Sequence, residues 1–193
     1  MAADRSTIFA YYYFDFQDTA KRDLRGLLSS LLMQLSECSV GCWDVLNQLY
    51  TTCRDGSEQP SEAALAGCLK DMLVLAGHVP LYIIIDALDE CPITTGTPSP
   101  RRSVLDFLKD LVSQKYPNLR ICITSRPEQD IQVTLNPLTS PSCRLSLHEE
   151  SGQIEDIYNY IRFFVYSDEA MRGWSAEHQD LVINTLSERA SGM

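Results

Sequence analysis

The sequence predicts an α/β fold in which a parallel sheet carries helices on both faces. Apolar, strand-like runs alternate along the chain with segments of helical period, which is typical of this class. The strand-like runs are continuous in their apolar character, as expected for strands covered on both faces. The length of 193 residues, with 45% hydrophobic and 22% charged residues, is sufficient for a globular core.

The first half of the chain is expected to supply one strand and three helices. The aromatic run IFAYYYFDF predicts a strand over 8–16. Leucines at helical spacing predict a helix over 21–37 that packs on the sheet. A second helix is expected over 41–53. After a polar loop, Ser61 caps a third helix that ends at Gly77.

The second half adds further strands and helices around a loop rich in proline and threonine at 91–102. The expected strands cover 81–86, 119–124 and 143–147. One helix is expected to begin at Ser103, and further helices are expected over 128–133, 151–166 and 175–190. The pattern divides the chain into an α/β core over 1–150 and the start of a helical region over 151–193.

Composition excludes several classes of partner. The 26 acidic residues outnumber the 16 basic ones, which gives a formal net charge of −10. Such a surface repels nucleic acid and anionic membranes, and the chain has no apolar run long enough for a membrane span. The seven cysteines contain no C-x-x-C pair and the three histidines are far apart, so a zinc site is not expected. These features indicate a cytoplasmic protein with reduced cysteines.

Three acidic residues gather where the LYIIID strand ends. Asp86 is its last residue, and Asp89 and Glu90 follow in the same loop. In open α/β sheets, ligands bind at the carboxyl ends of the strands. Mg²⁺ on a nucleotide phosphate would offset this negative charge, because it binds few carboxylates and keeps several waters. The structural alternative is a helix whose first turn carries acids for capping and dipole reasons.

A second polar cluster follows the LRICIT strand. Thr124 or its neighbour Ser125 can donate to a phosphate or a water, and Arg126 presents a fork of donors that suits a terminal phosphate. The alternative is an exposed arginine paired with Glu128. Only one helix is expected between the two strands, so both clusters should open at the same edge of the sheet.

These segments carry a resemblance to a known family. The runs IFAYYYFDFQDTAKRDLRGLLSSLLMQL, LYIIIDALDEC and LRICITSRPE resemble, in order, the NACHT-type ATPase module of fungal NOD-like receptor proteins, also called the nephrocystin-3-like N-terminal domain. That family belongs to the signal-transduction P-loop NTPases. The resemblance implies a three-layer P-loop-NTPase-like sheet and a switch that binds ATP or GTP with Mg²⁺, hydrolyses it slowly and oligomerises.

The resemblance also implies roles for single residues. Asp86 corresponds to the Walker B aspartate near magnesium, and Asp89 and Glu90 correspond to the acidic pair that orients the attacking water. Arg126 corresponds to the sensor arginine near the γ-phosphate; the nucleotide contact expected of Thr124 rests on its hydroxyl donor and not on the resemblance. The family usually has glycine where Ala87 stands, which is a small departure.

A larger departure is the absence of G-x-x-x-x-G-K-[ST] from the 193 residues, since none of the four lysines follows a glycine. In the family, the P-loop strand precedes the IFAYYYFDF-like strand and lies between the Walker B and sensor strands. We therefore expect an internal piece of a longer receptor that binds no nucleotide or magnesium by itself. Its partners would be the missing P-loop segment or other copies of the module.

Without the P-loop strand, LYIIID and LRICIT could pair directly, leave an open gap, or take a strand from another chain. Two alternative functions also stay open. One is a non-enzymatic interaction module that oligomerises through the exposed sheet. The other is an unrelated α/β enzyme, such as a phosphatase, that uses Asp86, Asp89 and Glu90 as magnesium ligands. The enzyme alternative is disfavoured because no second acidic strand end is present.

Overall fold

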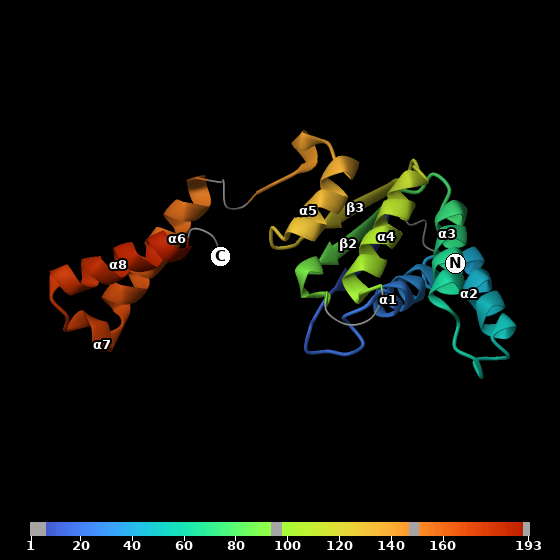
Figure 1. The fold of residues 1–193 in the computed structure, drawn as a ribbon, viewed down its shortest axis with the longest axis horizontal. Coiled ribbons are helices and arrows are strands. Elements are labelled where there is room, and N and C mark those ends of the chain that lie inside the picture. Colours follow the sequence, from blue (N-terminus) through green and yellow to red (C-terminus); the bar gives the residue numbers. More distant parts are fainter. Residues whose placement is uncertain (1–6, 94–97, 147–150, 191–193) are drawn as a thin grey trace. The chain divides into compact units, whose positions relative to one another are not determined.

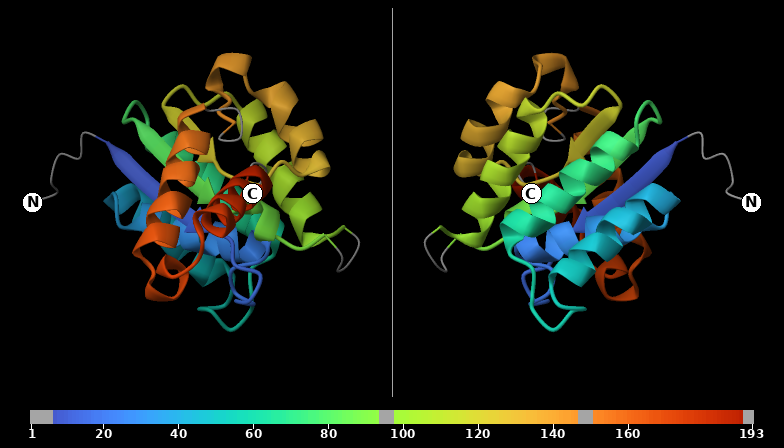
Figure 2. Two further views of the ribbon diagram at one scale, coloured as in Figure 1. Left: turned by 90° about the vertical axis from the view of Figure 1, so that its left-hand side faces the viewer. Right: turned by 90° about the vertical axis from the view of Figure 1, so that its right-hand side faces the viewer.

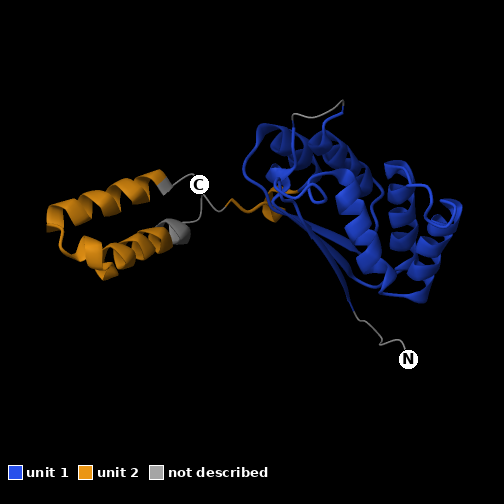
Figure 3. Cartoon of the chain, turned by 90° about the horizontal axis from the view of Figure 1, so that it is seen from below, with its two compact units in different colours: residues 1–139 blue, residues 140–193 orange. Residues whose placement is uncertain are grey.

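The computed structural model describes residues 7–93, 98–146 and 151–190 (Figure 1). The chain divides into two compact units, 1–139 and 140–193 (Figure 3). The expected assignment of 1–150 to an NTPase core and 151–193 to a following helical region remains a prediction.

The first unit is an α/β structure built on a parallel sheet. Its strands are β1 (Ile8–Tyr13), β2 (Leu81–Asp86) and β3 (Leu119–Ile123), and its helices are α1 (Leu24–Ser36), α2 (Val40–Thr52), α3 (Glu62–Leu75), α4 (Pro100–Ser113) and α5 (Gln129–Leu135). Short 3₁₀ turns lie at Leu88–Glu90 (η1) and Asn136–Leu138 (η2). The strands run parallel in the order β1-β2-β3, with Ile8, Leu81 and Leu119 in register. The predicted α/β class with a parallel sheet is confirmed.

Side-chain caps explain where four of the helices begin. Asp23, Ser39, Ser61 and Ser99 precede α1, α2, α3 and α4, and each side chain accepts a hydrogen bond from an amide of the first turn. The cap at Ser61 agrees with the sequence prediction. The predicted start of α4 at Ser103 is three residues late, because Ser99 and the proline that follows it form the N-terminus instead.

One face of the sheet is covered by helices (Figure 2, right-hand view). Ala10, Ile83 and Ile85 on that face are almost fully buried, and they belong to one core cluster with the leucines of α1, α3 and α4. The helix leucines recur at intervals of three and four residues, so each helix presents an apolar stripe to the sheet. The helical periodicity of the sequence is therefore realised as predicted.

Alternate residues of β1 and β2 are exposed, which differs from the expected burial of these strands on both faces. The exposed positions are Phe9, Tyr11, Tyr13, Tyr82, Ile84 and Asp86. The rings of Phe9 and Tyr82 stack with their centroids 5.2 Å apart. Continuous apolar character suggested two-sided burial, but tyrosine rings can stand at a water-facing surface because their hydroxyls remain hydrated.

The strands β2 and β3 pair directly. The ladder joins Leu81–Ile85 to Leu119–Ile123, and it is extended by hydrogen bonds from Leu81 N to Asn118 O (2.9 Å) and from Thr124 N to Ile85 O (2.9 Å). Of the three arrangements considered for these strands, the structure has the one in which they are neighbours. This pairing brings the ends of the two strands together.

The predicted strand over 143–147 is not present in the described part of that segment. A 3₁₀ turn, η3 (Pro141–Cys143), precedes an irregular stretch in which Leu145 is 87% exposed, and residue 147 lies outside the described residues. The amides of Cys143 and Arg144 donate within the turn, to Ser140 O (3.0 Å) and Pro141 O (3.2 Å), so they do not join a ladder, and the apolar side chain of Leu145 is not packed in a core. The prediction for 143–146 is wrong.

The second unit is helical. It contains η3 together with α6 (Ser151–Ser167), α7 (Glu169–Arg172) and α8 (Ala176–Ala190). The helices α6 and α8 pack against each other around the buried residues Val165 and Ile183. Gln179 Nε2 donates to Met171 O at 2.9 Å, which ties α8 to the end of α7. None of the described helices is long and apolar enough to cross a bilayer.

Candidate functional site

The acidic loop after β2 is held against the end of β3. Ala87 adopts a left-handed conformation with φ 54° and ψ 45°, which turns the chain sharply into η1. Its amide donates to Thr124 Oγ1 at 3.1 Å, and the amide of Leu88 donates to Thr124 O at 3.0 Å. The side chain of Leu88 is fully buried and anchors the loop in the core. A positive φ also explains why glycine would suit this position.

The first contact between predicted site residues joins Asp86 to Thr124. The Thr124 hydroxyl donates to Asp86 Oδ1 while accepting from the amide of Ala87. Both Asp86 and Thr124 are exposed to solvent. The two predicted residues at the ends of neighbouring strands are therefore in direct contact, and Asp86 keeps a carboxylate oxygen for a further ligand.

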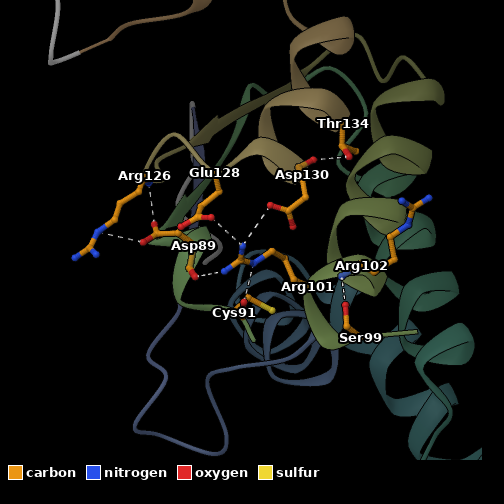
Figure 4. A network of polar contacts seen from close by, with 9 residues as sticks. All are labelled: Asp89, Cys91, Ser99, Arg101, Arg102, Arg126, Glu128, Asp130 and Thr134. Atoms are coloured by element: carbon orange, nitrogen blue, oxygen red, sulfur yellow. Dashed lines mark hydrogen bonds and ion pairs between the residues drawn. The ribbon is translucent and has the colours of Figure 1, made fainter. Parts of the chain in front are cut away.

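The second contact joins Asp89 to Arg126 (Figure 4). Asp89 Oδ1 accepts from the amide of Arg126 at 3.0 Å, and Asp89 Oδ2 lies 3.5 Å from Arg126 Nε. The Asp89 side chain is only 12% exposed, whereas that of Arg126 is 83% exposed. The carboxylate is thus fixed by the protein, while the guanidinium remains accessible from solvent.

The third predicted acid has a different partner. Glu90 Oε2 accepts from the amide of Phe16 at 3.3 Å, which links the acidic loop to the segment that follows β1. The buried thiol of Cys91 adds to this link by donating to Arg22 O at 3.2 Å. Asp89 and Glu90 therefore contact different parts of the unit.

Arg101, which no sequence pattern indicated as a site residue, lies beneath this site (Figure 4). Arg101 lies in the first turn of α4 and is 5% exposed. Its guanidinium contacts the carbonyl oxygens of Asp89 and Cys91 and the carboxylates of Glu128 and Asp130. Because it follows a proline in a segment expected to be a surface loop, nothing in the local pattern indicated burial.

The thiol of Cys91 is not suited to nucleophilic chemistry. Burial raises its pKa to about 12, although the positive charge of nearby Arg101 acts in the opposite direction. Burial also raises the pKa of the Tyr12 hydroxyl, and the negative charge of Asp23 adds to that effect. Both groups stay protonated at neutral pH and serve the packing of the unit.

The residues present match only part of a magnesium site. Among the described residues, no three His, Cys, Asp or Glu side chains lie close enough together to hold a metal ion. Mg²⁺ that bridges nucleotide phosphates takes only one or two protein carboxylates. Asp86, exposed and bonded through a single oxygen, fits that smaller role.

Comparison with known proteins identifies the family. The family model described as "Nephrocystin 3, N-terminal" matches residues 1–126. That range contains β1, β2 and β3 and ends at Arg126, so it includes all five predicted site residues. No curated protein and no solved structure matches the chain. The match covers well over half of the sequence, and the chain belongs to the nephrocystin 3 N-terminal family.

Proposed function

We propose that this chain carries the acidic and sensor side of a nucleotide site in a cytoplasmic NACHT-type signalling NTPase of the NOD-like receptor kind. The observation that carries the proposal is the joining of two motifs at one sheet edge. Asp86 is bonded to Thr124, and Asp89 is bonded to Arg126. Family membership adds independent support.

In this proposal each residue has one task. Asp86 contacts the magnesium that accompanies ATP or GTP, and the metal would offset charge on the phosphates. Arg126 and Thr124 donate to phosphate oxygens, for which the exposure of the Arg126 guanidinium leaves room. Asp89 and Glu90 orient the attacking water. Their contacts to Arg126 and Phe16 hold both carboxylates in place before nucleotide arrives.

The proposal also states that the 193 residues alone bind nucleotide poorly. A nucleoside triphosphate brings about three to four negative charges to a protein of net charge −10. The P-loop amides, lysine and hydroxyl that normally offset this charge are not in the sequence. Arg126 supplies one cation, and its high exposure weakens the attraction through solvent screening.

The location of the site can be tested with Mn²⁺–ATP at millimolar concentration, where weak binding becomes visible by NMR. Paramagnetic broadening is expected to centre on the amides of 86–90 and 124–126 and to disappear in Asp86→Asn. A matched control is Asp106→Asn, which removes an exposed carboxylate from α4. Broadening centred elsewhere, or unchanged in Asp86→Asn, would overturn the proposal.

The exposed face of the sheet favours a second candidate function, an interaction module that pairs with another copy of itself. The register places Phe9, Tyr82 and Arg120 in one row and pairs Tyr13 with Asp86 at the other end, where Asp86 is bonded to Thr124. A face-to-face pair with antiparallel strands would set the Arg120 row of one copy against the Asp86 row of the other. This arrangement is self-complementary in charge around an apolar centre.

Sedimentation velocity tests this second function. The small area of a three-stranded face predicts a weak dimer, with a dissociation constant of tens of micromolar or above. Ile84→Asp at the centre of the face is expected to abolish the dimer, whereas Val133→Asp, at an exposed position of α5, is expected to leave it unchanged. A chain that stays monomeric at millimolar concentration would rule the second function out.

A further inference from the structure

Arg101 is a buried cation in an unfavourable place. It occupies the first turn of α4, where the helix dipole repels positive charge, and it is 5% exposed. A buried charge of this kind is stable only when acceptors surround it. The contacts of its guanidinium therefore show which parts of the chain depend on it.

Those contacts fall into two groups. On one side, Arg101 Nε donates to Cys91 O at 2.8 Å and Nη2 donates to Asp89 O, so the guanidinium binds the backbone of the acidic loop. On the other side, Nη1 lies 3.4 Å from Asp130 Oδ1 and 4.0 Å from Glu128 Oε2. Both carboxylates follow Arg126 closely in the chain. One side chain thus cross-links the two segments that carry the site (Figure 4).

We propose that Arg101 is the positioning residue that holds Asp89 and Arg126 in contact. Arg101 fixes the backbone of Asp89 by donating to its carbonyl oxygen. Arg101 also pairs with the carboxylates of Glu128 and Asp130. Because the Glu128 amide donates to Arg126 O at 2.8 Å, these pairs fix the segment that carries Arg126. The functional meaning of this cross-link rests on the proposed nucleotide site. The cross-link itself is a property of the chain without any ligand.

The planar fork of the guanidinium is what the arrangement requires. A lysine at 101 would keep the charge but could not bond two carbonyl oxygens and two carboxylates at once. Arg102 provides a matched control in the same helix turn. Its side chain is 64% exposed and pairs only with Asp106 among the described side chains, at 3.0 Å.

The reporter is the amide of Arg126, because its hydrogen bond to Asp89 Oδ1 spans the two segments. Amide exchange measured by NMR on the full chain is expected to accelerate at Arg126 by about tenfold in Arg101→Lys. The ladder amides of β1 and β2 should change by less than about twofold. In Arg102→Lys every one of these amides should exchange as in the wild type.

Two results would overturn the inference. One is an Arg126 amide in Arg101→Lys that exchanges as slowly as in Arg102→Lys. The other is uniform acceleration of the ladder amides, which would assign Arg101 a purely structural role. If Arg101→Lys does not fold, Asp130→Asn decides the question, because it removes one partly exposed carboxylate that pairs with Arg101. Asp130→Asn is expected to accelerate amide exchange at Arg126 several-fold, and Asp130→Glu is expected to restore slow exchange. No nucleotide is used, so failure of the proposed function leaves this outcome unaffected.

Discussion

Gly26 in α1 permits a close approach that no larger residue allows. A Cβ built at this position lies 2.1 Å from the carbonyl oxygen of Ala20 and 2.6 Å from the hydroxyl of Tyr12. Tyr12 also donates to Ala20 O at 3.4 Å, so the added atom would push apart two groups that are bonded to each other. Gly67 in α3 has no atom within 4 Å of the same construction.

Two opposing effects, helix propensity and overpacking, set the expected change in the free energy of unfolding. Alanine improves helix propensity over glycine by about 1 kcal/mol at both sites. At Gly26, overpacking against backbone costs about 1–3 kcal/mol and the weakened Tyr12 bond about 1 kcal/mol more. Gly26→Ala should therefore lower the free energy of unfolding by about 1–3 kcal/mol, and Gly67→Ala should raise it by about 0.5–1 kcal/mol.

Urea unfolding followed by tryptophan fluorescence measures both changes. A Trp174→Phe background leaves Trp43, which lies in α2, as the reporter of the first unit. Coincident transitions by fluorescence and circular dichroism would establish that one unfolding equilibrium is being measured. Equal stabilisation by Gly26→Ala and Gly67→Ala would refute the packing argument for α1.

Three further predictions concern the site and its surroundings. Thr124→Val removes the hydroxyl that bonds Asp86 and Ala87, and it should lower the free energy of unfolding by about 1–2 kcal/mol in urea titrations; Thr124→Ser should retain most of the stability. Iodoacetamide at about pH 8 should modify the exposed Cys122 and Cys143 of the native chain and spare buried Cys42, Cys68 and Cys91, as mass spectrometry can show; equal labelling would contradict the burial. The hydrogen bond from Lys70 lowers the pKa of Asp110 below its ordinary 3.8, so this pair stabilises the fold above that pH and the contribution is lost as pH falls through the lowered pKa. Lys70→Met should cost less than about 1 kcal/mol at neutral pH, because the pair is partly exposed, and the difference from wild type should vanish in acid.

The order of strands and helices could be predicted from the sequence because each element carries its own periodicity. The leucine spacing of α1 and the short β-branched run of β2 are enough to predict a helix and a strand from the local sequence alone. The burial of only one sheet face could not be predicted in this way. Apolar runs such as those of β1 look the same whether or not a helix covers the second face.

For the candidate site, the charged residues could be predicted from the sequence, but their contacts could not. Asp86, Asp89, Glu90 and Arg126 stand out in the sequence because charged residues follow buried strands. Their partners depend on chain geometry, and the contact between Glu90 and the amide of Phe16 spans 74 positions in sequence. The burial of Arg101 could not be predicted because it depends on where α4 begins, and the ends of helices are their least predictable part.

Isothermal titration of the purified chain with Mg-ATP tests the central claim most directly. The account predicts no saturable heat below about 1 mM nucleotide, because the acidic and sensor side of the site lacks the donors that offset phosphate charge. Asp86→Ala should be indistinguishable from the wild type in this range. Micromolar binding by the wild type that disappears in Asp86→Ala would show that the residues described here suffice for a nucleotide site, and it would contradict the account.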